Sequence, residues 1–193
     1  MFIQSFSDTR QPVVFQRKLE VLPGGITVAA ADLTQDTLYA GTPVGKASNG
    51  LFHVIKQAVL YANASNTDTG YKVLKNHNYK VGDFITQKPG ANAQAITAID
   101  STTSASFDTI TVATTLGVAM TAGDVIVQAK QLATANDSVL NYEPVGYVGT
   151  TMNIVQGDSN LVDCVVRGTI IPAALNKPVH SAIQAKTPLV RFY

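Results

Sequence analysis

The sequence predicts a mainly β protein: a compact barrel-like or sandwich-like β body with an inserted small β subdomain and little helix. Short β-forming runs lead into glycine and restart one or two residues later, as in 38–46 and 145–149. A Gly-Asp pair also precedes an apolar pair in 81–85 and again in 122–126. Glycine permits a positive φ and aspartate accepts hydrogen bonds from nearby backbone, so each pair predicts a turn that opens a strand.

Three parts follow along the chain. We expect an extended N-terminal arm at 1–20, a β-rich body made of 21–80 plus 129–193, and an inserted β-hairpin subdomain at 81–128. The insertion opens and closes on the two Gly-Asp turns. Between them Ile110 and Val112 alternate with threonines, which is the period-two pattern of a strand with one apolar face.

The body carries further local signals. Asn49-Gly50 predicts a hairpin, because both residues tolerate a positive φ. The following run, 51–62, is expected to be one long strand. Only 130–140 and 171–183 have room for one or two turns of helix, since glycine and β-branched residues interrupt the other runs.

Composition excludes some partners. The 193-residue chain has 14 basic and 13 acidic residues, and its charged fraction of 14% is low beside about 25% for soluble domains. No basic stripe is present, so we expect no nucleic-acid partner. No apolar run is suited to a membrane span or a signal peptide. The weakly charged exterior fits either burial against other subunits or a threonine-rich β surface.

The arm is the candidate interaction site. Pro12 disfavours helix before it, and Val13, Val14 and Phe15 favour an extended strand, with Arg17 and Lys18 close behind. We expect these residues to pair with a strand of another protein, the backbone supplying affinity and the cations steering approach. The alternative is an ordinary edge strand of the chain's own domain.

Catalytic and metal sites are not predicted. Cys164 lies in a strand-like run and is expected to be a buried core residue. His53, Asp83 and Ser159 follow the order of a serine-peptidase triad, but the flanking residues do not support one. His53, His77 and His180 lack partners at metal-ligand spacing, so no cofactor or metal is expected.

Three segments resemble tailed-phage capsid decoration proteins: 40–46, 144–149 and 165–170. The inserted segment with its Gly-Asp turns is similar to phage head fibre proteins. The resemblance covers about 20–180. It implies a β-rich protomer that forms a homotrimer on the outside of an icosahedral head and contacts the major capsid protein. The family offers no catalytic residues.

The sequence therefore predicts a virion structural protein, a head decoration or head fibre subunit, assembled in the host cytoplasm and placed on the capsid exterior. The alternative is a phage tail, baseplate or surface glycan-binding β-module. Such a glycan binder should show aromatic platforms, whereas this chain has no Trp and scattered Tyr. An all-β trimeric enzyme is a third class that no constellation of residues supports.

Overall fold

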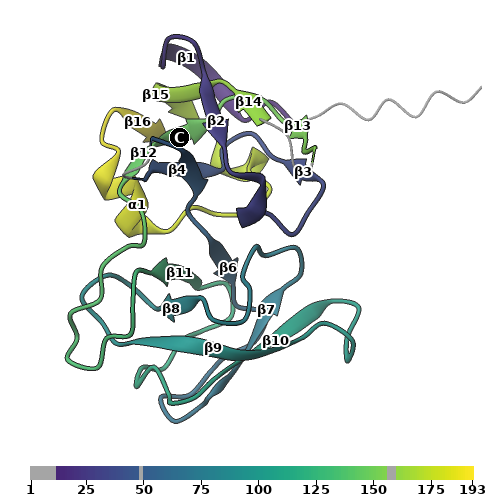
Figure 1. Ribbon diagram of the computed structural model, residues 1–193, viewed down its shortest axis with the longest axis vertical. Helices are drawn as coiled ribbons and strands as arrows, with labels where there is room; N and C mark the ends of the chain where they lie inside the picture. The colour runs from purple at the N-terminus through teal and green to yellow at the C-terminus, as the bar shows by residue number, and fades with distance from the viewer. Residues whose placement is uncertain (1–11, 48–49, 156–159) are drawn as a thin grey trace, which may run out of the picture.

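The chain folds into two stacked β lobes (Figure 1). The computed structural model describes residues 12–47, 50–155 and 160–193. We call the first lobe, built from the described residues of 12–56 and 141–193, the upper lobe, and we call 57–140 the lower lobe. The structure confirms the mainly β prediction, and the short helix α1 (Ser181–Lys186) is the one α-helix in the described part of the chain.

The upper lobe is a curled, open sheet. Its core holds aromatic and aliphatic side chains such as Tyr147, Ile170 and Val44, all fully buried. The two-stranded ribbon of β3 (Thr37–Leu38) and β13 (Met152–Asn153) lies beside it. Within the described residues, the strand order is β1 (Phe15–Val21), β15 (Cys164–Ile170), β12 (Pro144–Val148), β4 (Pro43–Lys46), β5 (Phe52–Val54), β2 (Ile26–Val28) and β14 (Asn160–Val162), and β16 (Val190–Phe192) pairs with β15.

The lower lobe is a six-stranded sheet whose first and last strands are joined. Its core contains Tyr71, Ile85, Ile110 and Ile126, all fully buried. A bridge between Leu60 and Val73 joins the first strand to the last, so the sheet closes into a small barrel. Its order in the described chain is β6 (Gln57–Val59), β11 (Val125–Ala129), β8 (Phe84–Thr86), β9 (Ala93–Asp100), β10 (Phe107–Val112) and β7 (Gly70–Leu74).

The two Gly-Asp turns are built as predicted. Gly82 and Gly123 have φ of 94° and 95°, and Asp83 and Asp124 accept hydrogen bonds from the backbone three residues earlier at 2.8 Å. Each turn leads directly into a strand, β8 or β11. The Gly-Asp prediction is confirmed at both places.

The turns also reveal an internal repeat. Gly82 N–H donates to the Ile96 carbonyl, and Ile96 N–H donates to that of Asp83. Gly123, Leu60 and Asp124 make the same pair of bonds. The units β6–β7–turn–β8 and β9–β10–turn–β11 are therefore equivalent. Each contributes its last strand to the first strand of the other, because β8 pairs with β9 and β11 with β6.

The lobes divide the chain earlier than the sequence indicated. The predicted insertion, 81–128, forms the strands β8 to β11, but β6 and β7 join the same barrel. The run 51–62 is two strands, β5 and β6, that belong to different lobes. An apolar β run has the same pattern whichever sheet receives it, so the crossing at Ile55 and Lys56 left no signal in periodicity.

Three other local predictions have clear outcomes. β4 and β5 form the predicted hairpin, with Gly50 at φ 87°, while Asn49 lies outside the described residues. Helix α1 begins inside the predicted 171–183 window, at Ser181, and ends three residues beyond it, at Lys186. The other window, 130–140, contains no helix; it is a loop bound to the barrel through the bridges Ala93–Ala133 and Ala129–Leu140.

Candidate functional site

The predicted arm residues form the edge of the upper lobe. Val14 and Phe15 are buried, and the Val14 carbonyl accepts a hydrogen bond from Ile171 N–H at 2.9 Å. β1 pairs with β15, starting at Phe15 opposite Ile170. Residues 15–20 of the predicted 1–20 arm thus have a partner in their own domain, the strand β15. These residues are an edge strand, the alternative left open by the sequence, because Phe15 completes the apolar core of this lobe.

Beyond Phe15, β1 is exposed on both faces. Every residue of β1 after Phe15 is exposed; Leu19 and Val21 are 62% and 41% exposed. Val13, just before the strand, is 69% exposed, and Pro12 is exposed too. In the described chain β1 has a strand on one side only. An open edge with uncovered apolar side chains is a ready surface for another chain.

The side chain of Lys18, unlike the exposed apolar side chains of β1, contacts its own sheet. Its ammonium lies 2.9 Å from Asp163 Oδ2, donates to Thr150 Oγ1 and sits 5.5 Å from the Phe15 ring centroid. The side chain is therefore held against its own sheet. Arg17, which was predicted to act with Lys18, is exposed and stands opposite Thr169 of β15.

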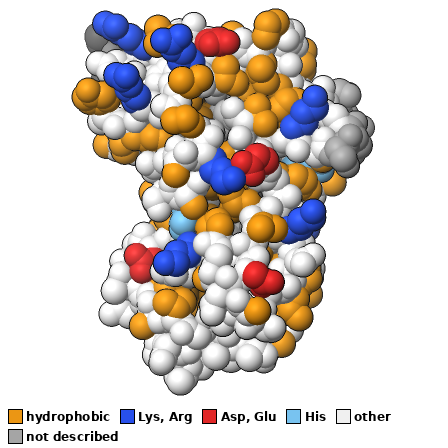
Figure 2. Space-filling model, turned by 90° about the vertical axis from the view of Figure 1, so that its left-hand side faces the viewer, with side chains coloured by type: hydrophobic (Ala, Val, Ile, Leu, Met, Phe, Trp, Pro, Cys, Tyr) orange, Lys and Arg blue, Asp and Glu red, His pale blue; other side chains and the backbone are white. Residues whose placement is uncertain are grey.

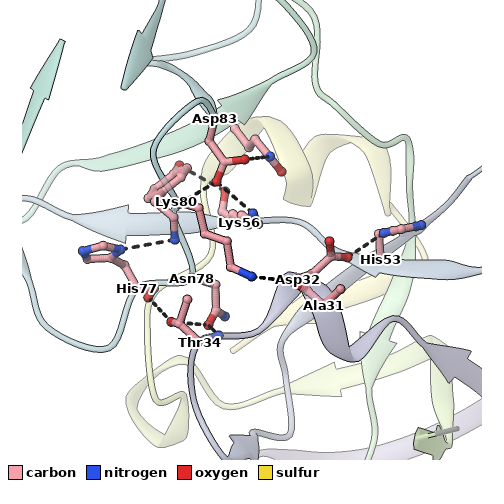
Figure 3. A network of polar contacts seen from close by, with 11 residues as sticks. Ala31, Asp32, Thr34, His53, Lys56, His77, Asn78, Lys80 and Asp83 are labelled. Carbon is pink, nitrogen blue, oxygen red and sulfur yellow. Dashed lines mark hydrogen bonds and ion pairs between the residues drawn. The ribbon is translucent and has the colours of Figure 1, made fainter. Parts of the chain in front are cut away.

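A second candidate is the polar junction between the lobes (Figure 3). Lys56, on the crossing segment, is nearly buried and lies 2.8 Å from Asp83 Oδ2. Asp83 also accepts from Lys80 N–H at 2.8 Å and from Gln128 Nε2 at 3.1 Å. The Tyr79 hydroxyl donates to the carbonyls of Lys56 and Ile126, and burial raises its pKa well above the usual value. A buried charge pair with this many hydrogen bonds fixes how the lobes meet.

Other contacts extend the junction. Lys80 Nζ donates to the Ala31 carbonyl at 2.6 Å. Thr34 donates through Oγ1 to the His77 carbonyl at 2.9 Å and through its N–H to Asn78 Oδ1 at 3.2 Å. These bonds join the 30–34 segment of the upper lobe to 77–80 of the lower lobe. The junction is a structural clamp made of hydrogen bonds.

The three histidines each have a structural partner. His53 Nδ1 lies 2.5 Å from Asp32 Oδ2, and its ring stacks on Tyr142 with centroids 4.4 Å apart. His77 Nδ1 accepts from Tyr79 N–H, and burial lowers the pKa of this imidazole. His180 caps α1 by accepting from Ala182 N–H, and its pKa is also lowered by burial.

The sequence order His53, Asp83, Ser159 does not become a triad geometry in the described residues. His53 pairs with Asp32, Asp83 pairs with Lys56, and Ser159 lies outside the described residues. Cys164 is fully buried, and burial raises the pKa of its thiol to about 11, so it is not an activated nucleophile. Its placement in the core is as predicted. No group of metal-ligating side chains occurs within the described ranges.

Comparison of the chain with family models, curated proteins and solved structures finds no match. Across the described residues, none of the helices has the length and apolar character needed to cross a membrane.

Sequence reasoning missed the junction because it joins residues far apart in the chain, such as Lys56 and Asp83. One signal was present. Lys56 interrupts the apolar run from Val54 to Val59, where a strand buried on both sides would carry no charge. A lone cation in such a run indicates a buried counter-ion elsewhere, and here that counter-ion is the aspartate of a Gly-Asp turn.

Proposed function

We propose that this chain is a virion structural protein, a capsid decoration or head fibre subunit that binds the outside of a phage head as a homotrimer and stabilises or adorns the shell. The observation that carries the proposal is β1: an edge strand with no neighbour on its outer side among the described residues and with exposed apolar side chains. The proposed partner of β1 is the major capsid protein. The chain would bind it on the capsid exterior, during assembly in the host cytoplasm. Neither nucleic acid nor membrane is proposed as a partner, and no enzymatic activity is proposed.

The shape of the molecule suits this role. The upper lobe offers the open edge, and the lower lobe is a closed barrel at the other end of the long axis (Figure 1). A subunit docked through the upper lobe would display the lower lobe outward. Specific interfaces bury about 1,600 Å² in total, so several contacts per trimer would add interface that a shell must lose before it opens.

The test uses undecorated heads of the phage that encodes the chain. We expect the purified protein to have the mass of a trimer in solution and to cosediment with those heads. Leu19→Asp should abolish cosedimentation by placing an unpaired charge on the β1 surface. Leu132→Asp is the matched control, because Leu132 is 52% exposed on the lower lobe. A wild-type chain that stays in the supernatant contradicts the proposal.

One observation favours the alternative, a surface glycan-binding module. Tyr61 and Phe107 stack with ring centroids 4.9 Å apart on the lower lobe, and Lys72 Nζ lies 5.2 Å from the Phe107 centroid. The fold thus brings together two aromatic residues that are scattered in the sequence. Because the two rings cover one another and a lysine covers Phe107, less aromatic face is left for a sugar. Retention on a glycan array that Tyr61→Ala abolishes would support this alternative.

A further inference from the structure

The arginines within the described residues gather on one corner of the upper lobe. Arginine occurs in the sequence at positions 10, 17, 167 and 191. Those within the described residues are Arg17 on β1, Arg167 on β15 and Arg191 on β16, and all are exposed. β1 and β16 both pair with β15, so the three arginines stand on adjoining strands.

The strand register places the three arginines on the same face. Thr169 of β15 is opposite Arg17 on one side and opposite Arg191 on the other. Residues directly opposite in a sheet point to the same face, and so do residues two apart in one strand, which adds Arg167. The neighbours of Arg191 in β16, Val190 and Phe192, pack into the core, so this face is the outer one. We call it the arginine face.

Irregularities in β1 produce this arrangement. Register shifts occur between Phe15 and Arg17 and again between Lys18 and Glu20. Each inserts an extra residue in β1, which re-aims the side chains that follow. After the first shift Arg17 stands opposite Thr169, although the core residue Phe15 is only two positions earlier. Gly168 permits the close approach, since a Cβ there would lie 2.5 Å from the Arg17 carbonyl oxygen.

The charge of the arginine face is largely uncompensated. Among the ion pairs formed by the described residues, none includes Arg17, Arg167 or Arg191. The acidic residue in register with them is Glu20, opposite Arg167. Strand spacing puts Arg17 and Arg191 roughly 10 Å apart at the backbone, with Arg167 about 7 Å along the middle strand from Thr169. Figure 2 shows Lys and Arg side chains near the end of the upper lobe, with hydrophobic side chains and an acidic side chain among them, whereas the end of the lower lobe carries few charges.

We propose that the arginine face binds a carboxylate-rich surface of a protein, with the guanidinium N–H groups donating paired hydrogen bonds to Asp or Glu carboxylates. The inference rests on the proposed function, in which that protein is the major capsid protein. Guanidinium geometry matches carboxylates, and arginine beside apolar residues is the composition of protein interfaces. The apolar neighbours are Leu19, near Arg17 on β1, and Leu189, two residues before Arg191, which are 62% and 59% exposed. A nucleic-acid site would instead need a longer basic stripe.

The experiment measures binding by fluorescence anisotropy of a labelled ten-residue glutamate peptide and a labelled ten-nucleotide thymidine strand, together with cosedimentation on undecorated heads. The test variant is R17Q/R167Q/R191Q. The matched control is K72Q/K88Q/K130Q, which removes equal charge from exposed positions off this face. R17K/R167K/R191K keeps the charge and removes the fork. Circular dichroism checks that each variant is folded.

We expect the wild-type chain to bind the glutamate peptide, the Gln variant to bind at least tenfold more weakly, and the control to stay within twofold. The Lys variant should fall between them. Equal loss in the control, or tighter binding of the thymidine strand than of the peptide, overturns the proposal. If the wild-type chain coats heads and the Gln variant coats them equally, the arginine face is not the docking surface although the proposed function stands. If the wild-type chain does not coat heads, the proposed function fails. The anisotropy measurement with the glutamate peptide still tests whether the arginine face binds carboxylates.

Discussion

The two lobes treat the edges of their sheets in opposite ways. The lower lobe joins its first strand to its last through Leu60 and Val73, so no strand edge of the described barrel is left open. The upper lobe ends on β1 and β14, and both carry exposed apolar residues, Leu19 and Leu161. A closed barrel has little left to offer another chain, whereas an open edge costs solubility unless a partner uses it. The two lobes therefore differ in what their edges can offer: the described upper lobe has open strand edges for pairing, and the closed barrel does not.

The largest expected effect tests whether the lobes are clamped. Asp83→Asn keeps an oxygen to accept from Lys80 N–H but leaves the buried Lys56 ammonium without its counter-charge. We expect a loss of about 3–5 kcal/mol in the free energy of unfolding, measured in urea. Asp124→Asn is the control from the equivalent turn, where, among the described residues, the carboxylate accepts its hydrogen bonds from Thr121, and it should cost about 1 kcal/mol. Equal costs would show that Lys56 gains nothing from Asp83.

The next effect separates the stability of the two lobes. Gly146→Ala puts a Cβ 2.5 Å from the Val165 carbonyl oxygen and 2.8 Å from Cys164 Sγ, inside the upper sheet. We expect a loss of about 1–3 kcal/mol and faster reaction of Cys164 with a thiol reagent, because this buried thiol reports opening of the upper lobe. Gly70→Ala in the lower lobe, with its nearest atom at 3.8 Å, should leave the reaction rate unchanged. If Cys164 of the Gly146→Ala protein reacts no faster than that of the wild-type chain, the thiol does not report opening of the upper lobe.

The smallest effect concerns acid. Burial lowers the pKa of His77 below its ordinary value of 6.5, so the unfolded chain takes up a proton that the folded barrel refuses. The free energy of unfolding should therefore fall as pH falls below about 6.5, down to the pKa of the folded state, with a slope of at most about 1.4 kcal/mol per pH unit. His77→Asn offers an oxygen to Tyr79 N–H and should reduce that slope in thermal melts between pH 7.5 and 5. An unchanged slope would place the acid sensitivity elsewhere, with His180 the next group to test.

Much of the fold could be predicted, since its signals are local. The Gly-Asp turns and the alternation of Ile110 and Val112 depend only on neighbours in sequence, and the structure has both. The lobe boundary was harder to predict, because 51–62 reads as β throughout and the crossing at Lys56 depends on a partner 27 residues later.

The candidate site was predictable only in outline. Of the β-prone residues from Val13 to Phe15, Phe15 belongs to a strand, β1, and the partner of that strand is β15 of the same chain. Periodicity cannot choose between a partner inside and outside the molecule. The arginine face could not be foreseen, because the register shift between Phe15 and Arg17 decides which way Arg17 points, and β16 brings Arg191 from the end of the chain.

Gln128 holds together the two chain segments that connect the lobes. The backbone of Gln128 donates to the Lys56 carbonyl at 3.0 Å and accepts from Asn141 N–H at 3.3 Å, so the chain leaves the upper lobe and returns to it side by side. Neighbouring entry and exit points make the graft of a foreign domain cheap in chain entropy, provided that its own ends lie close together. The upper lobe could therefore carry a different barrel between positions 56 and 141, provided that the replacement also supplies a counter-charge for Lys56.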